Sequence, residues 1–133
     1  MPPFVGSLLQ SAVDQGVLVL TVTQSRLQGE EVAEALRDEL HAAVARTGVN
    51  LVVIDLRHAR YLSSVAFWPL LSLRRQLLDA GGRLMICGLC EDVEDVFATT
   101  KMISTGGAVD APFEVAPDAD DAVARLVEDA RPA

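Results

Sequence analysis

Apolar residues in this chain alternate between short, nearly continuous runs and longer stretches in which they recur at helical spacing. Residues 17–23 are β-branched and almost uniformly apolar, which predicts a buried strand. A weaker strand is predicted over residues 7–13, and the turn signal Asp14-Gln15-Gly16 joins the two as a hairpin. Further strands are predicted over residues 51–56, 83–87 and 113–115.

Between these runs, the apolar residues are spaced three and four positions apart. Over residues 29–46, Val32, Leu36 and Leu40 fall on one helix face. A pair of glycines, Gly81-Gly82, is typical of a helix end and precedes one of the predicted strands. Further helices are predicted over residues 67–80, 91–101 and 118–130.

The alternation of strands and helices is typical of the α/β class, in which crossover helices connect parallel strands. We therefore expect a central mixed, mostly parallel sheet of four to five strands, with a hairpin at its N-terminal edge and about four helices. A chain of 133 residues is one domain's worth. The prediction is a single domain over residues 1–133 with its core over about 7–131.

The net charge of the chain limits the classes of molecule that it is expected to bind. Eleven basic side chains against nineteen acidic ones give a formal net charge of −8, which repels phosphate backbones and anionic lipid. Nucleic acid and membrane surfaces are therefore poor partners, and proteins or small ligands are expected. No apolar run approaches the ~20 residues of a membrane span, and the first residues lack the basic start of a signal peptide. Together with only two cysteines, this predicts a cytoplasmic protein.

Enzyme and cofactor motifs are missing from the sequence. It has no Gly-x-Ser-x-Gly elbow and no glycine-rich phosphate loop, and Lys101 is its only lysine. His41 and His58 do not stand at metal-ligand spacing and are interpreted as solvated or core-edge residues. We therefore expect no catalytic residues, no metal and no cofactor.

Cys87-Gly-Leu-Cys90 keeps one enzymatic alternative open, a thiol oxidoreductase. The motif follows a predicted strand and precedes a helix, as a redox dithiol does in thioredoxin-like folds. Two observations oppose it. Cys87 ends an apolar strand, where a free cysteine is commonly a small core residue, and acids such as Glu91 that follow Cys90 would raise a thiol's pKa.

The segment Tyr61-Leu-Ser-Ser-Val-Ala-Phe-Trp68 is the remaining candidate. It follows the strand predicted over residues 51–56 and leads into a helix, and function collects at the carboxyl ends of strands in open α/β sheets. Its two serine hydroxyls have two interpretations. They could cap the helix, or a phosphate added there could meet free backbone N–H groups at the helix start.

The chain resembles the STAS family, which is shared by bacterial anti-sigma factor antagonists and stressosome proteins. Residues 51–64, Leu-Val-Val-Ile-Asp-Leu-Arg-His-Ala-Arg-Tyr-Leu-Ser-Ser, look like the family's apolar strand, Asp, short exit and Asp-Ser-Ser/Thr motif. Residues 80–89 resemble its Gly-Gly, apolar strand, Gly segment, and residues 91–102 its third helix. Each piece alone is weakly specific, but their order and spacing together are stronger.

By that resemblance, Ser64 matches the serine that a partner kinase phosphorylates, and Ser63 is the second choice. The resemblance implies that the unmodified form binds an anti-sigma factor with kinase activity, and that phosphorylation disrupts this binding. This chain departs from the family pattern at Ser63, which replaces an Asp, and at residues 25–28, which replace Gly-Glu-Leu-Asp. Pro69 suits only a helix's first turn, so the helix should start near residue 66 or 67, with Ser64 in the loop ahead.

The expected partner surface combines residues 25–28, 61–68 and 89–91, because these segments should share one edge of a parallel sheet. Phe67 and Trp68 are adjacent and cannot share one helix face, so one of them should be the more exposed. The partner-binding residues predicted at this edge are Ser25, Gln28, Tyr61, Leu62, Ser63, Val65, Phe67, Trp68, Leu89 and Glu91.

The sequence thus predicts a cytoplasmic, bacterial regulator of transcription that acts by protein–protein interaction and resembles an anti-sigma factor antagonist. A STAS scaffold that is never phosphorylated is the first alternative, and the Cys87/Cys90 oxidoreductase is the second. The expected partner is an anti-sigma factor with serine kinase activity, and self-association into a homo-oligomer stays open.

Overall fold

Five strands form one mixed sheet in the computed structural model of the protein, which describes residues 8–103 and 111–130. Their order is β1-β2-β4-β6-β7, with β1 antiparallel to β2 and every other neighbouring pair parallel. This is the mixed, mostly parallel sheet that the sequence predicts. The strands are β1 (Leu9–Asp14), β2 (Val17–Val22), β4 (Leu51–Asp55), β6 (Arg83–Cys87) and β7 (Glu114–Ala116).

The hairpin between β1 and β2 is confirmed. Asp14 pairs with Val17 across a two-residue turn, in which Gln15 and Gly16 have φ angles of 53° and 81°. Positive φ at both central positions is the type I′ geometry that matches the twist of paired strands. The prediction placed the start of β1 at residue 7. The described strand starts at Leu9, and residue 7 and the predicted core's end at residue 131 lie outside the described residues.

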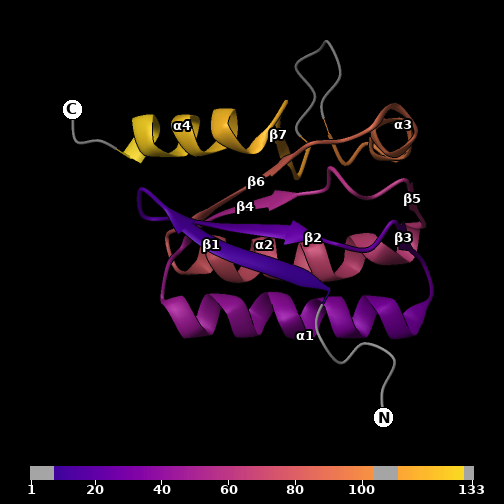
Figure 1. The fold of residues 1–133 in the computed structure, drawn as a ribbon, viewed down its shortest axis with the longest axis horizontal. Coiled ribbons are helices and arrows are strands. Elements are labelled where there is room, and N and C mark those ends of the chain that lie inside the picture. The colour runs from indigo at the N-terminus through magenta and orange to yellow at the C-terminus, as the bar shows by residue number, and fades with distance from the viewer. Residues whose placement is uncertain (1–7, 104–110, 131–133) are drawn as a thin grey trace.

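Helices cover both faces of the sheet (Figure 1). Helices α1 and α2 pack side by side under one face, and α4 lies on the other. Each face therefore has its own apolar core, and the central strands are buried on both sides as their continuous apolar sequences predict. The helices are α1 (Glu30–Thr47), α2 (Phe67–Asp79), α3 (Glu91–Thr99) and α4 (Ala119–Ala130). None of the helices in the described part of the chain is both long and apolar enough to cross a bilayer.

A second, two-stranded sheet was not predicted. In it β3 (Arg26–Leu27) pairs in parallel with β5 (Tyr61–Leu62). Two-residue strands carry no readable period, so only their pairing across the fold reveals them. A single 3₁₀ turn, η1 (Ser64–Ala66), follows β5 and runs directly into α2.

The junction between α2 and β6 depends on a close backbone approach at Gly82. Its N–H donates to the carbonyl of Leu77 at 2.7 Å, and the Arg83 N–H donates to the carbonyl of Asn50 at 2.9 Å. A Cβ on Gly82 would lie 2.1 Å from the Asn50 carbonyl oxygen, a backbone atom that cannot rotate away. At neighbouring Gly81 the requirement is different, because φ is +76° but a Cβ would meet nothing within 4 Å.

We expect Gly82→Ala to lower the free energy of unfolding by about 3 kcal/mol or more, because β4 and β6 would have to separate at their start. The matched variant Gly81→Ala should cost only the left-handed conformation, about 1 to 2 kcal/mol. Urea unfolding of both variants measures the difference. Equal losses would show that the contact at Gly82 is absorbed by a backbone shift.

Candidate functional site

Ser64 lies at the start of the 3₁₀ turn between β5 and α2. β4 ends at Asp55, and the chain crosses the carboxyl edge of the sheet before it reaches this turn. Ser63 occupies the position before the turn, and its carbonyl accepts a hydrogen bond from the Ala66 N–H at 3.0 Å. Helix α2 begins at Phe67, within the predicted boundary, while Ser64 lies in this turn rather than in an irregular loop.

The two serine hydroxyls have different surroundings. Ser64 is exposed, whereas Ser63 is half-buried and its Oγ is enclosed without a hydrogen-bond partner among the described residues. No side chain caps either η1 or α2, so neither hydroxyl has the capping role that was one interpretation of the sequence. The first N–H groups of a helical turn have no partner within the turn. An exposed oxygen on Ser64 is therefore close to groups that favour a negative charge.

Backbone hydrogen bonds bring the segment 25–28 to this turn. The Ser25 carbonyl accepts from the N–H groups of Arg60 at 2.7 Å and Tyr61 at 3.1 Å, and the Ser63 N–H donates to the Leu27 carbonyl at 2.9 Å. The strand β3 within this segment and the hydrogen bonds on either side of it hold residues 60–63 in place. The pairing rigidifies the approach to Ser64.

The third predicted segment also reaches this edge. Cys90, at the position before α3, donates from its Sγ to the carbonyl of Ala59 at 3.5 Å, and α3 packs against β5. The segments 25–28, 60–68 and 89–91 therefore lie at one end of the molecule. We call this the Ser64 surface, and its exposed members are Ser25, Arg26, Gln28, Arg60, Tyr61, Ser64, Trp68 and Glu91.

Other predicted contact residues are less accessible. Leu62 and Phe67 lie in the core, and Phe67 packs edge-on against Phe97 with 4.9 Å between ring centroids. Ser63, Val65 and Leu89 are half-buried. The expectation that one of two adjacent aromatic residues is the more exposed is confirmed, because Phe67 is 4% exposed and Trp68 48%. Any contact through this surface must use its exposed members.

Two arginines lie against the exposed aromatic rings, and sequence reasoning missed both. The guanidinium of Arg26 lies 4.9 Å from the ring centroid of Tyr61, and that of Arg37 lies 5.0 Å from the ring of Trp68. Such cation–π contacts are attractive and limit the rotation of the ring. The two pairs span different elements, so no spacing along the chain could have revealed them.

A small notch opens beside Trp68, between the first turns of α1 and the start of α2. Its volume is about 210 Å³, which fits about one side chain. Ala33, Val65 and Trp68 provide apolar walls, and the exposed carboxylates of Glu30 and Glu34 add negative charge. The notch adds a shaped, acidic depression to the Ser64 surface.

Buried Asp55 holds the exit from β4. Its Oδ1 accepts from the Arg57 N–H at 3.0 Å, and its Oδ2 lies 3.7 Å from the Arg57 Nε. A Cβ on Gly88, which has a φ of +74°, would lie 2.5 Å from the same carboxylate. Asp55 therefore fixes the chain where it leaves the sheet on its way to Ser64.

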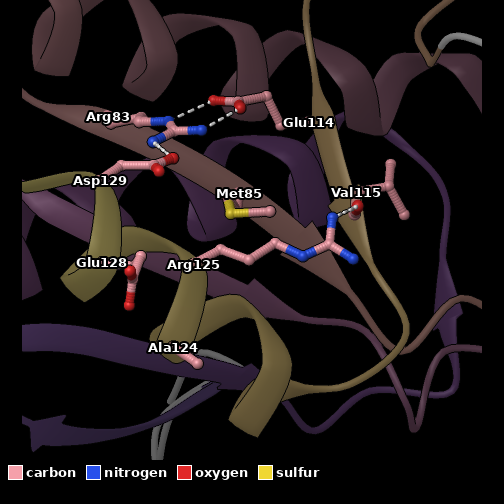
Figure 2. A pocket seen from close by; sticks show the side chains of 8 residues that line it. All are labelled: Arg83, Met85, Glu114, Val115, Ala124, Arg125, Glu128 and Asp129. Carbon is pink, nitrogen blue, oxygen red and sulfur yellow. Dashed lines mark hydrogen bonds and ion pairs between the residues drawn. The ribbon is translucent and has the colours of Figure 1, made fainter.

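A depression of about 510 Å³ lies elsewhere (Figure 2). Arg83, the first residue of β6, hydrogen-bonds Glu114 and Asp129 there, and these two bonds raise the pKa of its guanidinium. Arg125 reaches the Val115 carbonyl at 3.5 Å and also pairs with Asp121. Because these groups neutralise one another at the amino end of the strands, the depression serves to attach α4 rather than to present a reactive group.

Comparison with known proteins identifies the fold. The family model described as the STAS domain matches residues 9–110. An anti-sigma factor antagonist from Mycobacterium paratuberculosis superposes with a TM-score of 0.73 at 22% identity, over 89% of this chain and 92% of that one.

Two further solved structures have the same arrangement. The anti-sigma factor antagonist SpoIIAA of Bacillus, in its unphosphorylated form, superposes with a TM-score of 0.69 at 15% identity, over 93% of this chain and 99% of that one. A chain from the stressosome superposes with a TM-score of 0.68 at 15% identity, over 92% and 100% of the two chains. Because the family model spans most of the sheet and its helices, this chain belongs to the STAS domain family.

Proposed function

We propose that this protein is a cytoplasmic regulator of the anti-sigma factor antagonist type, which binds an anti-sigma factor with serine kinase activity through the Ser64 surface. The observation that carries the proposal is the exposed Ser64, at the start of a 3₁₀ turn, with exposed Tyr61 and Trp68 on either side of it in the chain. Aromatic residues are enriched at interface hot spots. The family and the described fold support a role in protein binding rather than in catalysis.

Phosphorylation of Ser64 would act as the switch. SpoIIAA, which shares this fold, is known in a phosphorylated and an unphosphorylated form. A phosphate would bring about −1.5 to −2 charges into a contact that must otherwise lose its water.

Ser64→Asp should weaken binding of the partner by about 30- to 5000-fold, the equivalent of about 2–5 kcal/mol for a disrupted charged contact. Ser64→Ala should bind like wild type, because it removes only an exposed hydroxyl that makes no capping bond. The partner is first isolated from native extract with the tagged protein and identified by mass. Emission of Trp68, the chain's single tryptophan, then measures binding of the purified partner.

Two controls separate the possible outcomes. Ala124→Asp places a carboxylate on exposed α4, away from the Ser64 surface, and should leave affinity unchanged. A partner with kinase activity should add phosphate to wild type and not to Ser64→Ala. If Ser64→Asp binds as tightly as wild type and no phosphate is added, the constitutive STAS scaffold replaces the switch.

Burial of Cys87 opposes the thiol oxidoreductase alternative. Cys87 is fully buried at the end of β6, and this burial, followed by the nearby carboxylate of Asp55, raises the pKa of its thiol to about 12. At pH 7 the thiolate fraction is then about 10⁻⁵, whereas a redox dithiol commonly has one thiol with a pKa near 7 or below. Both Cys87 and Cys90 are free thiols in the structure.

In a Cys90→Ser variant, we expect native protein at pH 7 to react extremely slowly with an aromatic disulfide reagent. One thiol should become reactive on unfolding in guanidinium, and the native rate should rise with pH because the thiolate is the reacting form. Cys87→Ser serves as the matched variant, in which half-buried Cys90 should react faster than Cys87 does. Rapid, stoichiometric reaction of native Cys87 at neutral pH would support the thiol oxidoreductase alternative instead.

A further inference from the structure

Strand β1 is an edge of the sheet with little cover. It pairs with β2 on one side, and no strand of the described residues lies on its other side. Figure 1 shows β1 at the margin of the sheet, with α1 and α2 under one face and α4 over the other. Five of its six residues are exposed, and Val13 is 55% exposed. The outer half of this hairpin therefore projects beyond the packed layers.

The phase of the β1–β2 ladder shows which backbone groups point outward. Asp14 and Val17 flank the two-residue turn, which makes them a hydrogen-bonded pair. Hydrogen-bonded and non-hydrogen-bonded pairs then alternate along the hairpin. At its other end the Thr23 N–H donates to the Leu8 carbonyl at 2.8 Å, so Leu8 and Thr23 are hydrogen-bonded, as the alternation from Asp14 and Val17 requires. The N–H and C=O groups of Ser11 and Val13 therefore point away from β2.

This edge lacks the usual devices that prevent pairing. Natural edge strands carry Lys, Pro or a bulge, but residues 10–13 are Gln-Ser-Ala-Val, and every residue of β1 pairs one-to-one with β2. The opposite edge, β7, is only three residues long, is followed by Pro117, and has its Glu114 side chain tied to Arg83. Of the two edges described, β1 is the one built to accept another strand.

We propose that β1 pairs antiparallel with β1 of a second copy of this chain, with Ala12 opposite Ala12 on the two-fold axis. In this register Ser11 of each copy faces Val13 of the other, so the outward N–H and C=O groups of Ser11 and Val13 form four reciprocal hydrogen bonds. Gln10 faces Asp14, whose carboxylate can accept from the Gln10 amide, and the two Asp14 charges stay apart. A register with Val13 opposite Val13 would leave Ser11 facing the turn.

The pairing is independent of the proposed function, because it uses none of the residues of the Ser64 surface. It would join two five-stranded sheets into one continuous sheet. The interface is small, and an interface below about 1,200 Å² is typical of weak association, so the dimer should depend on concentration.

Disulfide trapping tests the register directly. Residues on a two-fold axis in a non-hydrogen-bonded antiparallel pair have Cα atoms about 4.5 Å apart, within the range that a disulfide spans. In a Cys90→Ser background, Ala12→Cys should form covalent dimers under mild oxidation at least about tenfold faster than Gln10→Cys, whose copies lie four pairs apart. Ala124→Cys, exposed on α4, gives the rate of random collision. An Ala12→Cys rate equal to that of Ala124→Cys would overturn the proposal.

Sedimentation of the unmodified chain provides the second measurement. Wild type should shift from monomer to dimer as concentration rises, and Ser11→Pro should remain monomeric, because it removes an outward N–H and no β1–β2 bond. Val13→Lys should also remain monomeric, because the added positive charges of the two copies repel each other. Leu78→Lys, at an exposed apolar position on α2, should dimerise like wild type. A wild-type chain that stays monomeric, or a dimer that survives both β1 variants, contradicts the pairing. Ser64→Asp should still dimerise, which separates this result from the switch.

Discussion

Burial of β4 on both faces is the constraint from which the rest of the structure follows. It is the middle strand of five, and Val52, Val53 and Ile54 have no exposed surface. Its neighbours β2 and β6 both run parallel to it and are connected to it by crossovers, which places the exits of β4 and β6 at one edge. Asp55 is the polar residue at that boundary. Its carboxylate binds the Arg57 N–H, so the chain turns at a defined point and delivers Ser64 to the surface.

The sequence predicted the elements that have a long period and missed those that depend on contacts distant in sequence. The runs around β2, β4 and β6 and the helices α1 and α2 are readable because their apolar spacing repeats over several turns or residues. The β3–β5 pair is two residues long in each strand, and the stacking of Arg37 on Trp68 joins α1 to α2. Neither leaves a local signal, and both shape the candidate site. The three segments of the candidate site could therefore be predicted from the sequence, whereas the strand pairing and ring contacts that order them could not.

Several arginines of this acidic chain have structural partners. Arg83 is held by two carboxylates, Arg57 lies against Asp55, and Arg37 contacts both Trp68 and Asp38. Arginine suits this role because its planar guanidinium can stack on a ring and bind a carboxylate at once. The Ser64 surface carries charge of both signs, because Glu30 and Glu34 line the notch beside Trp68 while Arg26 and Arg60 are exposed in its segments.

The local charge at the 3₁₀ turn bears on the presence of Ser63 where the family pattern has an acid. Two like charges about 5 Å apart repel even when partly screened, and a phosphate beside a carboxylate would carry this cost in the folded state. A neutral hydroxyl at residue 63 removes the nearest such charge, although its enclosed Oγ forgoes a hydrogen bond. Phosphorylation would then change the charge on the turn from zero to about −2, and no other charged side chain of the turn would make this relative change smaller. In this chain Asp55 fixes the backbone at the exit from β4, while the two serines leave the turn itself without a charged side chain.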